Sequence, residues 1–152
     1  MSRTLVVDAS VAVKWFKKGE DFEEEALSLR DDVLSSTVAG LASELMQLEV
    51  CRALLKAGYP SGKIRETYAT LSEMDELGFL KSVPTSALKS EAKDLMVDLN
   101  LYVCDALSLA TAVISSSDLL TEDRHLLKTE VREAMSRLGL RTLRLKDAYG
   151  GK

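Results

Sequence analysis

The feature that most constrains the fold is a short apolar run, Leu5-Val6-Val7, followed directly by Asp8 and then by a helix-like segment. An apolar run of this length with polar flanks is typical of a buried strand. Asp8 would then stand at the carboxyl end of the first strand, where open α/β sheets have their ligand crevices. A charge beside a buried strand costs free energy unless it is paired or binds a cation. Asp8 is therefore the first candidate functional residue.

Short apolar runs alternate along the chain with longer segments of helical periodicity. Strands are predicted at residues 4–8, 36–39, 79–83 and 119–121, with an edge strand at 141–145. Helices are predicted at residues 10–18, 22–34, 41–57, 61–77, 86–99, 103–115 and 123–138, the first with Ser10 as its N-cap. This alternation predicts an α/β fold with a mostly parallel sheet of four to five short strands, covered on both faces. The length of 152 residues and the 46% hydrophobic share suit a single domain over residues 1–152.

The available side chains exclude several kinds of active site. His125 is the only histidine, which rules out zinc sites built on several histidines and disfavours a Ser–His–Asp triad. Cys51 and Cys104 lack the CxxC spacing of metal-binding cysteines, and we expect them to be reduced and packed. Any chemistry must therefore rest on carboxylates and hydroxyls.

Charge and hydropathy bear on partners and location. The net charge of −4 argues weakly against nucleic acid, whose binding proteins usually carry an excess of Lys and Arg. If four of the 24 acids formed a metal site, however, 20 acids would remain to balance 20 basic residues. No apolar run approaches the roughly 20 residues of a membrane span, and few residues precede the first strand. We expect a cytoplasmic protein with no membrane partner and no cleavable signal peptide.

Three further acids stand at positions comparable with that of Asp8. Asp123 follows the fourth predicted strand, Glu49 lies on the third predicted helix, and Asp105 opens the sixth. Each also has a simpler interpretation. Glu49 is spaced to pair with Arg52 one turn away, Asp105 suits the positive end of a helix dipole, and Asp123 is a good N-cap. No single acid decides between structure and function.

Taken together, the four acids predict a metal site. Clustered carboxylates raise each other's pKa unless a cation neutralises them, and oxygen ligands suit Mg²⁺ or Mn²⁺. Ser10 and Thr121, which neighbour Asp8 and Asp123 in sequence, would orient the carboxylates or bind water. A site of this kind lowers the pKa of a bound water and holds a phosphate. Hydrolysis of a phosphodiester is the reaction that follows most directly.

Four stretches of the chain resemble, in order and spacing, those of PIN-domain proteins, and in particular the small VapC-type toxins of bacterial and archaeal toxin–antitoxin pairs. The stretches are VVDAS at 6–10, EVCRAL at 49–54, DALSLA at 105–110 and LTEDRHL at 120–126. The resemblance implies a three-layer α/β/α sandwich and a metal-dependent endoribonuclease. It gives the acidic role to Asp8, Glu49, Asp105 and Asp123, and a supporting hydroxyl role to Ser10 and Thr121.

The same resemblance implies ligands and partners. Asp8, Asp105 and Asp123 would bind Mg²⁺ or Mn²⁺, and Glu49 would complete the shell directly or through water. Cleavage would leave a 5′-phosphate and a 3′-hydroxyl on RNA. The candidate phosphate contacts near the acids are Lys14, Arg52, Lys56 and Arg124. The implied partners are the RNA substrate, a second copy in a homodimer, and a cognate antitoxin whose helix packs in an apolar groove.

Two features leave alternatives open. Family members often carry asparagine where this chain has Arg52, and an Arg52 that neutralises Glu49 would make the protein a PIN-fold binding module with weak or no nuclease activity. The apolar stripe of the predicted helix 61–77 belongs either to the core or to a partner groove; its members are Ile64, Tyr68, Leu71 and Met74. A phosphatase-like or receiver domain is disfavoured, because Ser10 stands where the phosphatase pattern has a second aspartate.

Overall fold

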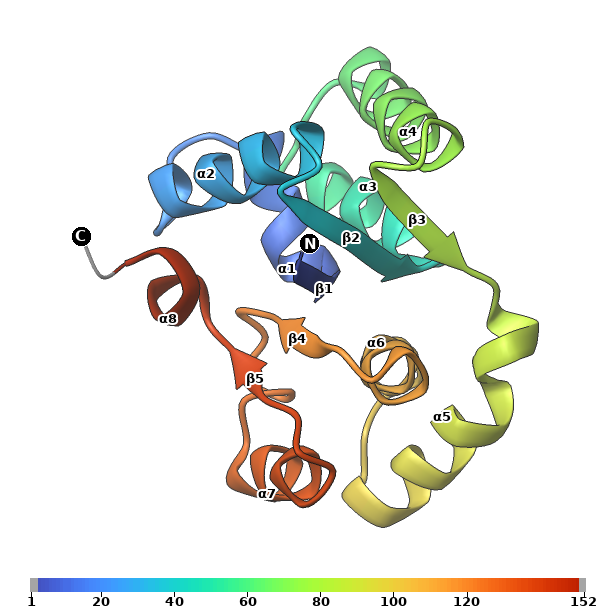
Figure 1. Ribbon diagram of the computed structural model, residues 1–152. Coiled ribbons are helices and arrows are strands. Elements are labelled where there is room, and N and C mark those ends of the chain that lie inside the picture. The colour runs from blue at the N-terminus through green and yellow to red at the C-terminus, as the bar shows by residue number, and fades with distance from the viewer. Residues whose placement is uncertain (1–2, 151–152) are drawn as a thin grey trace.

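Parallel strands form the centre of the molecule. The computed structural model describes residues 3–150. Its five-stranded sheet has the order β3-β2-β1-β4-β5, and each neighbouring pair is parallel (Figure 1). The strands are β1 Arg3–Val7, β2 Val38–Ser43, β3 Leu80–Val83, β4 Asp118–Leu120 and β5 Thr142–Leu143. The predicted α/β fold with a mostly parallel sheet is confirmed.

Helices cover both faces of the sheet. One layer consists of α1 (Ala9–Ala12), the 3-10 helix η1 (Val13–Trp15), α2 (Glu23–Leu34), α3 (Met46–Lys56), α4 (Ser61–Glu76) and α8 (Leu145–Tyr149). The other consists of α5 (Thr85–Leu99), α6 (Val103–Ser115) and α7 (Thr129–Arg137), as Figure 1 shows. Alternate side chains of β1 face opposite layers, since Leu5 and Val7 belong to the first core and Val6 to the second. The result is a three-layer α/β/α sandwich.

The helix predicted at residues 41–57 begins later than expected. The strand predicted at 36–39 begins at Val38 and continues to Ser43 as β2, which lies between β1 and β3 and pairs with both. Gly40 allows this approach, because a Cβ there would stand 2.8 Å from Leu80 Cδ1 and 3.1 Å from the Phe79 carbonyl oxygen. The prediction that the helix begins at Leu41 was wrong, because strand pairing with distant segments overrides local periodicity.

Two other predicted helices are shorter in the structure. Asp8, rather than Ser10, is the N-cap of α1, because its carboxylate accepts from the Ser10 backbone N–H. The segment predicted as helix 123–138 is helical only from Thr129, because Asp123 closes a turn by accepting from the His125 N–H. The predicted edge strand at 141–145 is reduced to β5, and α8 follows it without having been predicted.

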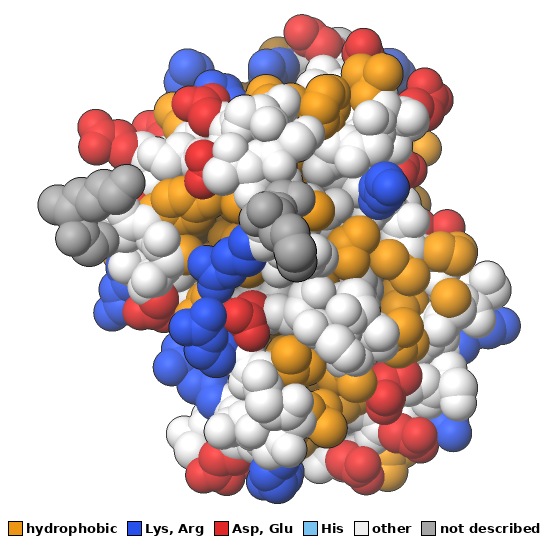
Figure 2. All heavy atoms as spheres, viewed as in Figure 1, with side chains coloured by type: hydrophobic (Ala, Val, Ile, Leu, Met, Phe, Trp, Pro, Cys, Tyr) orange, Lys and Arg blue, Asp and Glu red, His pale blue; other side chains and the backbone are white. Residues whose placement is uncertain are grey.

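The surface at the amino ends of β1 and β4 carries ion pairs. Arg3 and Arg141 both pair with Asp118, at 3.4 and 3.0 Å. Figure 2 shows basic and acidic side chains side by side on the face in view. Within residues 3–150 no single helix is long and apolar enough to cross a membrane; α5 and α6 together pass that test by length and composition, but are bent by 116° where they meet.

Candidate active site

Asp8 lies at the junction between β1 and α1. Its backbone N–H donates to the Leu120 carbonyl at 3.0 Å, which continues the pairing of β1 with β4 for one more residue. The residue is only 3% exposed. A carboxylate this deeply buried requires hydrogen-bond donors or a cation.

Three hydroxyl groups supply donors to Asp8. Its Oδ2 accepts from Ser10 Oγ at 2.6 Å and from Thr121 Oγ1 at 3.1 Å, and its Oδ1 accepts from Ser108 Oγ at 2.7 Å. The structure thus brings both Ser10 and Thr121 to Asp8, although Thr121 neighbours Asp123 in the sequence. Ser108 was missed. The available signal was its position three residues after Asp105, on the same face of α6.

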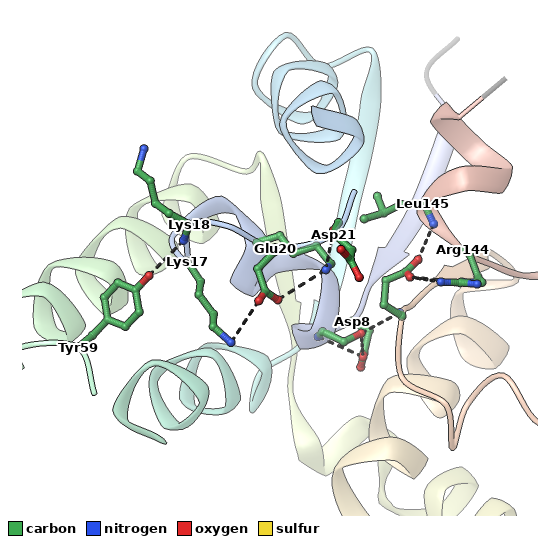
Figure 3. Close-up of polar contacts among 11 residues, drawn as sticks. Asp8, Lys17, Lys18, Glu20, Asp21, Tyr59, Arg144 and Leu145 are labelled. Carbon is green, nitrogen blue, oxygen red and sulfur yellow. Dashed lines mark hydrogen bonds and ion pairs between the residues drawn. The ribbon is translucent and has the colours of Figure 1, made fainter. Parts of the chain in front are cut away.

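The loop after β4 is held in place from both sides. The Glu122 N–H donates to Ser10 Oγ at 2.9 Å, and the Asp123 N–H donates to Thr121 Oγ1 at 3.0 Å. On the other side the Glu122 carboxylate accepts from the Arg144 guanidinium and from the Leu145 N–H (Figure 3). These bonds tie the loop that carries Asp123 to both Asp8 and the C-terminal segment.

Glu49 on α3 and Asp105 on α6 complete a group of mutually repelling acids. Burial, followed by the charges of Asp8, Asp105 and Asp123, raises the pKa of Glu49 to about 8. Burial, followed by the charges of Asp123 and Asp8, raises the pKa of Asp105 to about 6, against an opposing effect of His125. Asp105 is 8% exposed, so the simpler interpretation as a solvated first-turn acid does not hold. The four acids predicted from the sequence share one electrostatic environment.

These acids fit a hard divalent cation by their chemistry. Glu49 Oε1 is buried and has no hydrogen-bond partner in residues 3–150, which leaves it free to coordinate. Carboxylate oxygens are the donors that Mg²⁺ and Mn²⁺ prefer, and a cation would reverse the rise in pKa of Glu49 and Asp105. In the described part of the chain, no three His, Cys, Asp or Glu side chains stand close enough to hold one ion in their present positions.

A cleft of about 660 Å³ adjoins Glu49 and Asp123. Its lining residues are Leu45, Leu48, Glu49, Arg52, Ala53, Lys56, Cys104 and Asp123. Arg52 and Lys56 put positive charge on its wall, as expected for contacts to a phosphate backbone. Burial, and then the charges of Glu49 and Asp105, raises the pKa of the Cys104 thiol. Cys104 was not predicted to belong to this region.

One face of α3 is more exposed than its sequence predicts. The spacing of Leu41, Leu45, Leu48 and Leu55 predicts a buried stripe along this helix, but Leu48 is 57% and Leu55 is 56% exposed. Arg52 lies on this exposed side. No ion pair joins it to Glu49 within residues 3–150, so the alternative of an internal Glu49–Arg52 pair does not hold.

The other two candidate phosphate contacts do not line the cleft. Lys14 is buried, and its ammonium donates to the Asp21 carbonyl at 2.8 Å and pairs with Glu20 at 3.6 Å. Figure 3 shows Glu20 and Asp21 in this cluster. Arg124 is exposed in the loop that follows Asp123. Lys14 therefore holds the segment before α2, whereas Arg124 is near an acid in sequence but absent from the cleft wall.

The apolar stripe of α4 divides between two surroundings. Leu71 and Met74 are buried in the first core, and Tyr68 is 45% exposed. Ile64 lines a groove of about 350 Å³ between α3 and α4, with Cys51, Arg52, Leu55, Ser61 and Arg65. Core packing accounts for Leu71 and Met74, and Ile64 borders an open groove.

Comparison with known proteins agrees with this architecture. The crystal structure of FitAcB from Neisseria gonorrhoeae is similar with a TM-score of 0.51 and 17% sequence identity, over 80% of this chain and 88% of that one. At this identity the likeness concerns the fold alone. A search of curated protein sequences finds no significant match. A family model of the PIN domain, however, matches residues 5–148. Because that match spans nearly the whole sequence, the chain belongs to the PIN domain family.

Proposed function

We propose that this protein is a Mg²⁺- or Mn²⁺-dependent endoribonuclease and the toxin of a toxin–antitoxin pair. PIN domains are generally nucleases, and they generally use divalent metal ions. The observation that carries the proposal is the electrostatic interaction among Asp8, Glu49, Asp105 and Asp123, which come from four separate segments. Together with burial, it raises the pKa of both Glu49 and Asp105. The toxin assignment rests on the resemblance of the four motif stretches to VapC-type proteins.

In this proposal each side chain has a definite part. Asp8, Asp105 and Asp123 hold the cation, and Glu49 completes its shell directly or through water. When bound, the cation lowers the pKa of a water and balances charge on the phosphate. Ser10, Thr121 and Ser108 orient the Asp8 carboxylate by donating to it. Arg52 and Lys56 bind the phosphate backbone that enters the cleft.

The experiment is an RNA-cleavage assay with purified protein in Mg²⁺, in Mn²⁺ and in EDTA. Asp8→Asn and Asp105→Asn should abolish metal-dependent cleavage while leaving the circular dichroism spectrum unchanged. Asp98→Asn, at an exposed position on α5, is the matched control and should cleave like the wild type. A wild-type protein that leaves varied RNAs intact with either metal, or an active Asp8→Asn variant, would contradict the proposal.

The binding-module alternative depended on neutralisation of Glu49 by Arg52. Since no ion pair joins the two in residues 3–150, we assign Arg52 to substrate instead. The cognate antitoxin and the homodimer stay predictions. The groove between α3 and α4, with exposed Leu55 at its edge, is the surface we propose for the antitoxin helix. Sedimentation of the protein alone tests the homodimer.

A further inference from the structure

A separate cavity of about 300 Å³ lies next to two of the acids. It is lined by Asn100, Leu101, Tyr102, His125 and Lys128. None of these residues lines the cleft beside Glu49 and Asp123. One position in the chain and one hydrogen bond link the cavity to the acids. Tyr102 immediately precedes α6, whose first turn carries Asp105, and the His125 N–H donates to Asp123 Oδ1 at 2.7 Å.

Tyr102 is unusually exposed for an aromatic residue. Its exposed fraction of 73% is the largest of any aromatic residue in positions 3–150, ahead of Tyr68 at 45%. The ring stands at 83° to that of His125, with 5.6 Å between centroids. The perpendicular contact holds the Tyr102 ring in one orientation and leaves most of its surface open to a third flat ring.

The polar lining of the cavity suits a nucleotide. Asn100 ends α5 in a left-handed conformation, with φ of 53°, and brings an amide that can both donate to and accept from a base edge. Lys128 is half-buried and forms no ion pair with an acid within residues 3–150. An aromatic platform, an amide and an uncompensated cation are what proteins use to bind unpaired bases.

We propose that this cavity is a nucleobase subsite. An unpaired base of single-stranded RNA stacks on Tyr102, its edge bonds to Asn100, and Lys128 contacts a flanking phosphate. The inference deepens the proposed ribonuclease function and rests on it. Because the subsite adjoins Asp105 and Asp123, it sets which phosphodiester of the bound strand lies over the acids. An apolar partner surface would account for exposed Tyr102 but not for Asn100 and Lys128.

The test measures binding apart from cleavage. Wild-type protein in EDTA is titrated into short single-stranded RNA oligonucleotides that carry one 2-aminopurine, whose fluorescence falls when the base stacks. We expect quenching with wild-type protein, and a roughly 5- to 100-fold loss of affinity in Tyr102→Ala, the range of one base-stacking contact. Tyr102→Phe should retain both quenching and affinity. Tyr68→Ala, an exposed tyrosine of α4, is the matched control and should bind like the wild type.

The salt dependence of RNA affinity tests the role of Lys128 independently. Lys128→Gln should reduce the slope of log affinity against log salt by about one, because one phosphate contact is lost. An unchanged slope would remove Lys128 from the subsite and overturn that part of the proposal.

The outcomes separate this inference from the proposed function. A Tyr102→Ala variant that binds RNA and quenches 2-aminopurine fluorescence like the wild type would overturn the subsite, whether or not the protein cleaves RNA. Tyr102→Ala that changes the sedimentation coefficient but not RNA affinity assigns the ring to a protein interface, and also overturns it. Tyr102-dependent quenching by a protein that cleaves nothing in Mg²⁺ or Mn²⁺ supports the subsite and contradicts the nuclease.

Discussion

Arg144 donates to Glu122 Oε1 from both Nε and Nη2, at 3.2 and 2.9 Å. The other carboxylate oxygen of Glu122 accepts from the Leu145 N–H at 2.8 Å. The Arg144 guanidinium also lies over the Phe22 ring, 5.4 Å from its centroid. Glu122 stands between Thr121 and Asp123, so the C-terminal segment fixes the loop that supplies two of the site residues.

We expect Arg144→Gln to loosen this loop. It removes two charge-assisted hydrogen bonds and should cost about 1–3 kcal/mol of unfolding free energy. Hydrogen exchange should accelerate at the amides of Glu122, Asp123 and His125, and Mn²⁺ affinity should fall. Arg141→Gln is the matched control, since Arg141 pairs with Asp118 at the amino end of β4. Equal effects of both variants on Mn²⁺ affinity would refute a positioning role for Arg144.

The hydroxyl of Ser108 should matter for activity beyond its effect on stability. Ser108→Ala removes the donor to Asp8 Oδ1 and should lower metal affinity or cleavage rate by roughly 10- to 100-fold. Ser115→Ala serves as control, because the Ser115 hydroxyl on the same helix donates to the Thr111 carbonyl, away from the acids. A Ser108→Ala variant with wild-type cleavage kinetics would show that Asp8 does not need this donor.

The acids should make the metal-free protein less stable as pH rises. The pKa of Glu49, about 8, and that of Asp105, about 6, both exceed their ordinary values of 4.5 and 3.8. The folded state therefore holds more protons than the unfolded state. Their stabilising contribution is complete below about pH 4 and is lost as pH rises through 6 and then 8.

Chemical denaturation in EDTA between pH 5 and 8 measures this loss. Glu49→Gln should reduce the decline by on the order of 1–2 kcal/mol, after allowance for partial exposure. Glu44→Gln is the control and should leave the decline over this range unchanged, because the Thr85 backbone N–H lowers the pKa of Glu44 and keeps it ionised above pH 5. A wild-type stability that rises steadily over this range would contradict the assignment of raised pKa values to the cluster.

Cation binding should release protons near neutral pH. Glu49, with a pKa of about 8, is mostly protonated at pH 7, and a ligating carboxylate must give up its proton. Calorimetric titration with Mn²⁺ in buffers of different ionisation enthalpy should show release of about one proton per site. Glu49→Gln should release less, and Asp8→Asn should bind weakly or not at all. Binding of Mn²⁺ to wild-type protein with no proton release would count against this role of Glu49.

Two lysines should respond differently to the same substitution. Lys56→Gln should weaken RNA binding and reduce its salt slope by about one, because Lys56 lines the cleft. Lys14→Gln should lower unfolding free energy instead, since the Lys14 ammonium is held by Asp21 and Glu20. RNA affinity should be unaffected in Lys14→Gln. Reversed effects of the two substitutions would place the phosphate path elsewhere.

Local patterns in the sequence were sufficient for much of the fold and for the choice of acids. The run Leu5-Val6-Val7 predicted β1 and placed Asp8 at its end, and helical periodicity located α4, α5 and α6 closely. These features depend on the periodicity of apolar side chains and on the residues that end helices and strands, and both act over a few residues. For the same reason Ser10 and Thr121 were identifiable as neighbours of acids.

The tertiary structure alone decided what depends on segments far apart in the chain. The strand predicted at 36–39 continued to Ser43 because Gly40 lets β3 approach, and Ser108 became a donor to Asp8 across 100 positions. Arg52 turned to solvent because the core takes the opposite face of α3. Burial and neighbouring charge, which no local pattern encodes, raised the pKa of Glu49. The sequence by itself determined which groups reach the end of the sheet; the packing decided which of them share one environment.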